Sequence, residues 1–256
     1  MKTKKVLTIF HTTDIHNKLN GNKLKKIKDL LSSCDTEFLL LDSGDFLLGG
    51  NIIFSPFEPV INKINELNYT AIAIGNREFN YFRSVFYNRL KKINTYLLAS
   101  NLIDLRFKKN NEKIKKNLYL VCNDIKICII GLTKPQYNEK HFWEFVTGFR
   151  FLNFYDSVSQ IVKDYYKITD VFLILSHLGI SDDINLAKFL KENYYNIINR
   201  FLILGGHDHK EFFDDSFIPI IHSEPYLKKI TKIELFFIDN KNHYDLDSIF
   251  LSRLDL

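Results

Sequence analysis

Residues 6–16 read Val-Leu-Thr-Ile-Phe-His-Thr-Thr-Asp-Ile-His, an apolar run that leads into two metal-binding residue types. The run Val6–His11 has the β-branched and aromatic composition of a buried strand. Asp14 and His16 follow in a loop, two residues apart, so both side chains can point at one metal ion. Ligand sites of α/β sheets lie in the crevice outside the carboxyl ends of the strands. The stretch therefore predicts an α/β fold with a metal site after its first strand.

The same arrangement recurs along the chain. Polar clusters follow apolar runs at Gly44-Asp45, Gly75-Asn76, Ser176-His177 and Gly206-His207-Asp208-His209. With the first cluster they supply two carboxylates, one amide and four imidazoles, which are Asp14, Asp45, Asn76, His16, His177, His207 and His209. All three groups bind divalent metals. One cluster alone is weak evidence, but five in this order predict a two-metal site.

Strand and helix patterns alternate along most of the chain. Strands are predicted at 6–11, 38–41, 71–74, 96–99, 171–175 and 201–204, with a hairpin at 118–122 and 125–130 and two closing strands at 218–222 and 230–238. Helices are predicted at 24–31, 60–67, 81–93, 155–166 and 184–192. This alternation indicates an α/β fold with mixed sheets. No linker-like tract divides the chain, so we expect residues 1–256 to form a single domain.

Composition is that of an ordinary globular protein, with 46% hydrophobic and 25% charged residues. No run approaches the roughly 18 apolar residues of a membrane span. The three cysteines show no C-x-x-C spacing and favour a reducing compartment. The apolar run Val6–Phe10 is too short for the core of a signal peptide. We therefore expect a cytoplasmic protein without a membrane partner, and the sequence does not indicate its oligomeric state.

The net charge of +5 is spread along the chain. Its densest basic stretches, Lys23–Lys28 and Lys108–Lys116, lack the interleaved aromatic residues that single-strand binders use for stacking. We expect solvated surfaces there and no nucleic-acid partner. Nuclease action stays a third hypothesis that rests on the charge alone.

A two-metal site suits the hydrolysis of phosphate esters. Two cations about 3.5–4 Å apart generate a hydroxide and clamp the attacking and leaving oxygens. Asp45 is the natural bridging carboxylate. The other predicted ligands are Asp14, His16 and His209 for one metal, and Asn76, His177 and His207 for the other. The charges of two divalent cations, two carboxylates and a bridging hydroxide sum to a net positive charge, which suits an anionic phosphate. This mixed donor set favours Mn, Fe or Zn over Mg.

These motifs resemble those of the calcineurin-like metallophosphoesterases, in particular the 5′-nucleotidase and 2′,3′-cyclic-nucleotide 2′-phosphodiesterase branch. The matching stretches are His11–His16, Asp42–Asp45, Gly75–Tyr81, Ala99–Leu102, Ser176–Gly179 and Gly205–His209. The resemblance spans nearly the whole chain and implies a four-layer αββα sandwich with two mixed sheets. It also implies a dinuclear metal-dependent phosphoesterase that acts on nucleotides, cyclic nucleotides or related small phosphates.

Two departures from the family pattern bear on activity. The residue after the metal-binding Asn76 is normally a His that contacts phosphate and assists the leaving group, and here it is Arg77. Asn80 stands where the nucleotidases have an Asp, as in the cyclic phosphodiesterase branch. The nucleotidases also carry a C-terminal domain that holds the base, and we expect this chain to lack one.

Three interpretations of Arg77 stay open. As a functional group it binds phosphate together with Asn76 and stabilises charge in the transition state, although a guanidinium cannot act as a general acid. As a mark of decay it gives a catalytically impaired homologue that binds metal and phosphate. As a neutral substitution it has no effect on function. Its position next to a metal ligand argues against this third interpretation.

Several neighbouring residues receive supporting roles. Asp208 is expected to point away from the site, His11 to pack within its strand, and Glu78 to hydrogen-bond around the metals. The pair Gly49-Gly50 either cradles phosphate or forms a turn. His141, His222 and His243 show no partner pattern, and we assign them no role.

Overall fold

The computed structural model describes residues 4–48, 58–106, 113–240 and 243–256. The pair Gly49-Gly50 and the start of the basic stretch at Lys108 lie outside these ranges. The described strands form two large sheets and a two-stranded ribbon. The first sheet has the order β15 (Tyr244–Asp255), β14 (Lys229–Asp239), β1 (Lys4–Thr12), β2 (Phe38–Asp42), β3 (Ala71–Ala73), β4 (Tyr96–Leu98) and β6 (Ile114–Lys115).

The second sheet has the order β12 (Phe212–Asp214), β13 (Ile220–His222), β11 (Phe201–Gly205), β10 (Val171–His177), β8 (Ile125–Thr133) and β7 (Asn117–Cys122). The ribbon pairs β5 (Leu102–Asp104) with β9 (Phe149–Phe151). Both large sheets are mixed. Strand β1 runs parallel to β2 and antiparallel to β14, and β8 runs parallel to β10 and antiparallel to β7.

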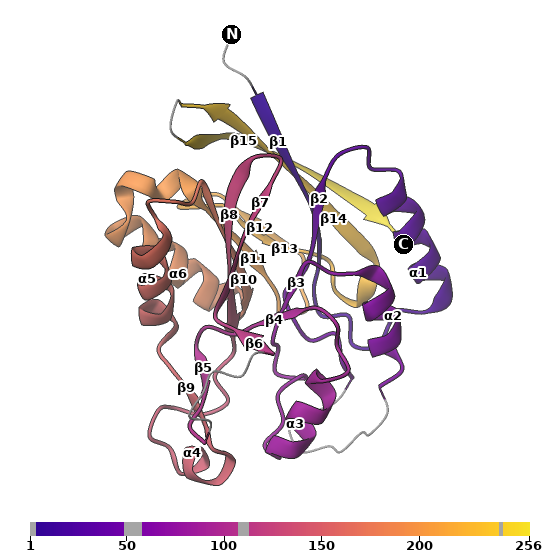
Figure 1. Ribbon diagram of the computed structural model, residues 1–256, viewed down its shortest axis with the longest axis vertical. Coiled ribbons are helices and arrows are strands. Elements are labelled where there is room, and N and C mark those ends of the chain that lie inside the picture. The colour runs from indigo at the N-terminus through magenta and orange to yellow at the C-terminus, as the bar shows by residue number, and fades with distance from the viewer. Residues whose placement is uncertain (1–3, 49–57, 107–112, 241–242) are drawn as a thin grey trace.

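Helices cover the outer faces of the two sheets (Figure 1). They are α1 (Gly21–Ser32), α2 (Val60–Leu67), α3 (Arg83–Leu90), α4 (Phe142–Thr147), α5 (Phe154–Tyr165) and α6 (Ile180–Asn193), with 3₁₀ turns at η1 (Tyr195–Arg200) and η2 (Pro225–Leu227). Figure 1 shows α1, α2 and α3 on one side of the sheets and α5 and α6 on the other. The predicted four-layer αββα order is confirmed. None of the helices in the described ranges is long and apolar enough to cross a bilayer.

Strand periodicity builds the layers. Because neighbouring side chains of a strand point to opposite faces, Leu173 and Leu175 of β10 enter the core between the sheets, while Phe172 and Ile174 face the α5 and α6 helices. A third core lies between the first sheet and α1–α3. Burial on both faces explains why these strands read as continuous apolar runs.

The C-terminal strands and the third helix differ from the sequence prediction, whereas the hairpin agrees with it. The two closing strands that were expected correspond to β13 and β14. The sequence prediction missed β15, because this partly exposed edge strand mixes polar and apolar residues. The helix expected at 81–93 is confined to α3. The hairpin prediction is confirmed, and both turn residues, Asn123 and Asp124, have the positive φ angles of a type I′ turn.

Gly131 sets how closely the two sheets approach. A Cβ atom there would lie 2.3 Å from Leu98 Cβ and 2.5 Å from Leu98 C, in the facing sheet. We therefore expect Gly131→Ala to lower the free energy of unfolding by about 1–3 kcal/mol through overpacking. Urea unfolding measures this. Gly21→Ala is the matched control, because no atom lies within 4 Å of its added Cβ, and equal stability of the two variants would contradict the prediction.

Candidate metal centre

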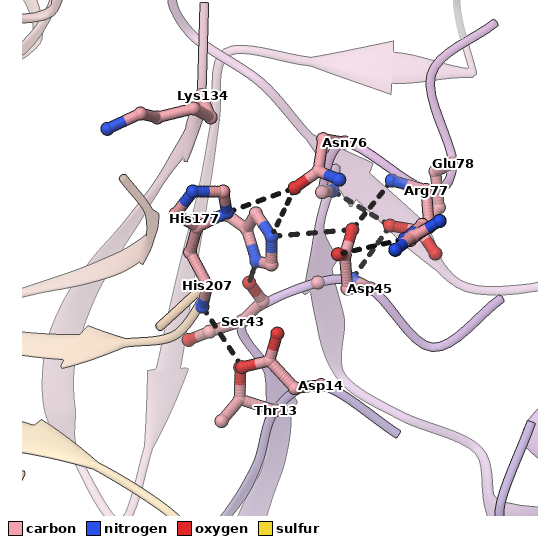
Figure 2. Close-up of polar contacts among 12 residues, drawn as sticks. Thr13, Asp14, Ser43, Asp45, Asn76, Arg77, Glu78, Lys134, His177 and His207 are labelled. Carbon is pink, nitrogen blue, oxygen red and sulfur yellow. Dashed lines mark hydrogen bonds and ion pairs between the residues drawn. The ribbon is translucent and has the colours of Figure 1, made fainter. Parts of the chain in front are cut away.

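The candidate ligands lie where strands of both sheets end, on one edge of the sandwich. Figure 2 shows residues from the loops after β1, β2 and β3 of the first sheet beside residues from the ends of β10 and β11 of the second. Asp14 and His16 follow β1, Asp45 follows β2, Asn76 follows β3, His177 ends β10, and His207 and His209 follow β11. The structure thus brings together all the side chains that the sequence proposed as ligands.

The first set of donors is compact. Asp14, His16, Asp45 and His209 each offer a donor atom, and these atoms all lie within 4.8 Å of one another. His209 Nε2 is 2.8 Å from His16 Nε2 and 3.4 Å from Asp14 Oδ1. Asp14 Oδ1 is buried and has no hydrogen-bond partner among the described residues. A buried carboxylate oxygen beside two imidazole nitrogens is a donor set that a divalent cation can satisfy.

The second set centres on Asn76. Its Oδ1 lies 3.1 Å from His177 Nε2 and 3.0 Å from His207 Nδ1. Asp45 links the two sets, because its Oδ1 is 3.3 Å from His177 Nε2 and its Oδ2 is 3.9 Å from His16 Nε2. One carboxylate therefore turns an oxygen toward each set, as a bridging ligand must.

The loops reach this geometry through strained backbone. Non-glycine residues adopt positive φ rarely, and such strain clusters at functional sites where surrounding bonds enforce it. Hydrogen bonds between loops supply that enforcement, since Asp14 N donates to Gly44 O at 2.9 Å and His16 N to Asp45 O at 3.0 Å. The ligand candidates with positive φ are Asp14 (51°), His16 (45°), Asp45 (60°), His207 (87°) and His209 (53°).

Glu78 connects the loop that holds Asp45 to the loop that holds Asn76 through hydrogen bonds. It is fully buried, and its carboxylate accepts hydrogen bonds from Asp45 N (2.8 Å), Gly75 N (2.8 Å) and Leu47 N (3.0 Å). Burial and the charge of Asp45 raise the pKa of Glu78 to about 7. The side chain fixes the backbone on which the bridging candidate sits.

His177 is held in one orientation. Its Nδ1 lies 2.7 Å from the carbonyl oxygen of Ser43, which can only accept, so Nδ1 carries the proton and Nε2 faces Asp45. Burial lowers the pKa of His177, but the Asp45 carboxylate raises it by more, so that the pKa lies at about 10. For Asp45 the directions are reversed: burial raises the pKa, and the charge of His177 lowers it by more, to below its usual value. The fold thus concentrates negative charge where a cation would bind.

Asp14 and His209 show the same mutual effect. Burial raises the pKa of Asp14, while the imidazoles of His16 and His209 bring it below its ordinary value. Interaction with Asp14 raises the pKa of His209. In contrast, burial and the charge of His177 lower the pKa of His207.

Sequence reasoning missed Tyr226, which contacts three of the candidate ligands. Its hydroxyl lies 2.9 Å from His209 Nδ1, its ring centroid is 5.6 Å from that of His16, and its N–H donates to Asp14 O at 2.9 Å. Tyr226 has a φ of 64°, and its carbonyl accepts a hydrogen bond from Lys23 Nζ at 3.0 Å. No motif marks this residue, and its strained backbone is visible only in three dimensions.

Arg77 lies at the edge of the centre. Its backbone N–H donates to Asp45 Oδ1 at 2.7 Å, and its Nε lies 4.0 Å from Asp45 Oδ2 (Figure 2). Nε is buried and without a hydrogen-bond partner among the described residues, while the side chain is 41% exposed. The guanidinium therefore adds positive charge beside the Asp45 carboxylate and reaches solvent.

The residues expected to play supporting roles stay outside the donor sets. Asp208 Oδ2 accepts a hydrogen bond from Ile180 N at the start of α6, at 2.6 Å. His11 is buried between the hydroxyls of Ser43 and Ser223, at 2.8 and 2.7 Å.

Comparisons with known proteins place the chain in a family. The sequence profile described as calcineurin-like phosphoesterase matches residues 7–211. The chain belongs to the calcineurin-like phosphoesterase family. This calcineurin-like phosphoesterase is therefore a hydrolase of phosphoesters by class, and divalent metals are the cofactors of that class.

Individual relatives agree with this family. The chain is 25% identical over 228 residues to the 5′-nucleotidase of Vibrio parahaemolyticus and 27% identical over 229 residues to the snake venom 5′-nucleotidase of Gloydius brevicauda. These matches cover 78% of this chain but only 39% and 36% of the relatives, so the phosphoesterase spans about two fifths of their length.

A solved structure shows the same fold. The structure of a 5′-nucleotidase precursor from Thermus thermophilus superposes with a TM-score of 0.75 at 19% identity, and the match covers 98% of this chain and 55% of that one. The likeness confirms the predicted metallophosphoesterase fold.

Proposed function

We propose that this chain hydrolyses phosphate mono- or diesters of nucleotides or cyclic nucleotides with two divalent ions, Mn, Fe or Zn. The observation that carries the proposal is Asp45, whose two oxygens face two separate donor sets. The 5′-nucleotidase relatives support a nucleotide as the substrate. The three cysteines are free thiols, which supports our proposal of a cytoplasmic location.

The residues present fit two metal ions. Asp14, His16 and His209 would hold one ion and Asn76, His177 and His207 the other, with Asp45 shared between them. Two atoms that such ions would satisfy are the buried Asp14 Oδ1, which has no hydrogen-bond partner among the described residues, and His177 Nε2, which faces Asp45. When bound, divalent ions polarise phosphoryl oxygens and lower the pKa of water.

The protein groups then position the substrate. Asn76 places its Oδ1 3.1 Å from His177 Nε2 and 3.0 Å from His207 Nδ1, and its Nδ2 and the Arg77 guanidinium are N–H donors beside these atoms. Two donors from adjacent residues can bind two phosphate oxygens and leave the third toward the donor sets. Fixed donors of this kind stabilise charge that develops in the transition state without reorganisation.

A metal titration and a substrate panel test the proposal. Purified protein freed of metal should bind Mn²⁺ by calorimetry and should then hydrolyse at least one of bis-p-nitrophenyl phosphate, p-nitrophenyl phosphate, 5′-AMP and 2′,3′-cyclic AMP. Removal of the metal with a chelator should stop turnover. Binding of Mn²⁺ and phosphate with no turnover across this panel would instead support a catalytically impaired homologue.

Loss of the Tyr226 hydroxyl should weaken metal binding. The hydroxyl lies 2.9 Å from His209 Nδ1, and removal of such an orienting partner typically costs about 10–100-fold in metal affinity. We expect Tyr226→Phe to raise the Mn²⁺ dissociation constant within that range while it leaves the ring packing against His16 intact. Calorimetry measures the affinity. An unchanged Mn²⁺ affinity would show that the hydroxyl does not orient His209.

A further inference from the structure

A cavity of about 560 Å³ opens between the start of α3 and α4. This volume lies within the roughly 300–1,000 Å³ of sites that enclose small molecules. Its surface is mostly apolar and aromatic, with two guanidinium groups at the edge. The residues that form it include Tyr81, Phe82, Arg83, Arg106, Trp143 and Val146.

The aromatic wall of this cavity consists of rings that pack against one another and expose part of their surface. The rings of Tyr81 and Trp143 lie 5.0 Å apart between centroids, and Tyr81 is supported from behind by Tyr137, with centroids 6.2 Å apart and an interplanar angle of 27°. Trp143 is 40% exposed and Phe82 is 55% exposed. Exposed aromatic faces held in place by packing are platforms on which a planar heterocycle can stack.

Two loops connect the cavity directly to the candidate metal centre. Tyr81 lies only four residues after Arg77, in the loop that follows β3. Four residues span at most about 14 Å even when fully extended, and this loop is shorter because Phe79 N bonds back to Gly75 O. Trp143 belongs to the segment after β8, which begins beside His177 at Lys134 (Figure 2).

Figure 1 shows both helices at the end of the molecule toward which β1 runs. The cavity and the centre therefore lie toward the same end of the fold, joined by the short Arg77–Tyr81 segment.

The two arginines at the cavity edge are fixed by their own chain. Arg83 Nε donates to Asp104 Oδ2 at 2.7 Å, and Arg106 donates to the carbonyls of Phe145 (3.2 Å) and Val146 (2.9 Å). Guanidinium planes held in this way can stack on a base and add positive potential along the path of an anionic ligand.

We propose that this cavity binds the purine or pyrimidine base of the substrate, while the phosphate lies at the metal centre. The proposal rests on the nucleotide hydrolysis proposed above and names where the chain itself would contact the base. Aromatic faces, cavity size, fixed arginines and the two connecting loops all favour a heterocycle joined to a phosphate. Sugar phosphates without a base would gain nothing from this surface.

Trp143 is the only tryptophan of the chain, so its fluorescence reports on the cavity without any need for turnover. Titration of the full chain with adenosine should change its emission in a saturable way, and ribose should leave it unchanged. Phe82→Ala should weaken adenosine binding by about 10-fold, because base stacking is typically worth about 1–3 kcal/mol per base. Phe250→Ala is the matched control, since Phe250 is 58% exposed on β15 and does not line the cavity.

Kinetics give a second and separate readout. Phe82→Ala should raise the KM for 5′-AMP by about 10-fold or more and leave kcat for 5′-AMP and both constants for glycerol phosphate unchanged. An emission that does not respond to adenosine at millimolar concentration, or equal losses with both substrates, would overturn the base site. Saturable adenosine binding in a protein that hydrolyses no phosphoester would instead overturn the proposed hydrolysis and leave a nucleoside-binding cavity.

Discussion

Replacement of Asp45 by asparagine should reduce phosphoester turnover by about 10³-fold or more, because metal ions contribute several kcal/mol to transition-state stabilisation and each 1.4 kcal/mol is about tenfold in rate. Asparagine keeps the volume and an oxygen for the hydrogen bond from Arg77 N, but it removes the charge that faces both donor sets. Calorimetry should show one Mn²⁺ binding event in the variant and two in the parent.

Asp208→Asn is the matched control for this experiment. Asp208 lies between His207 and His209 in sequence, yet its carboxylate accepts from Ile180 N at the start of α6, a bond that asparagine can also accept. This variant should retain the parental turnover, because the Asp208 carboxylate contacts Ile180 and not the reacting groups. If Asp45→Asn kept a tenth of the parental rate with both Mn²⁺ events intact, Asp45 would not be a bridging ligand.

The sequence was informative about the candidate ligands because each follows the end of a strand. An apolar run predicts a strand without any knowledge of its neighbours, and the parallel strands β1, β2, β3, β10 and β11 carry their polar ends to one edge of the fold. The pattern alone therefore brought residues as distant as Asp14 and His209 into one hypothesis. Their role as ligands remains a prediction until metal binding is measured.

Residues that support the site were not predictable in the same way. Tyr226 reaches His209 only because η2 has a left-handed backbone, which Lys23 stabilises from a distant helix. The short β5–β9 ribbon and α4 also escaped prediction, since three or six residues carry too little periodicity. Trp143, Val146 and Thr147 of α4 form one wall of the aromatic cavity, so no pattern in the sequence pointed to it.

Arg77→His should raise the turnover of substrates with poor leaving groups. Hydrolysis of 5′-AMP benefits from an acid that protonates the departing oxygen, and such help is typically worth about 10²–10⁴-fold. A guanidinium cannot supply it, because it does not lose its proton at accessible pH. The substitution should leave Asp45 in place, because the bond to Asp45 Oδ1 comes from the backbone N–H of residue 77 and not from its side chain.

The expected gain is selective. The rate for 5′-AMP should rise by about 10²-fold, at the lower end of general-acid effects. The rate for p-nitrophenyl phosphate, whose leaving group needs no proton, should change by less than about threefold, because the new imidazole can also donate an N–H to a phosphate oxygen. Asn80 accepts a hydrogen bond from Phe82 N at 2.8 Å. A second substitution, Asn80→Asp, would give the new histidine the carboxylate partner that the nucleotidases have and should increase the gain.

Arg77→Gln separates acid catalysis from simple loss of charge. Glutamine also removes the positive charge 4.0 Å from Asp45 Oδ2 but cannot protonate a leaving group. If the glutamine and histidine variants changed the 5′-AMP rate equally, the effect would come from charge next to the bridging carboxylate. Equal losses with both substrates would identify Arg77 as an adapted phosphate clamp, since the contact would be made in every transition state. Rates that stay at the parental level in both variants would place Arg77 outside the reaction path.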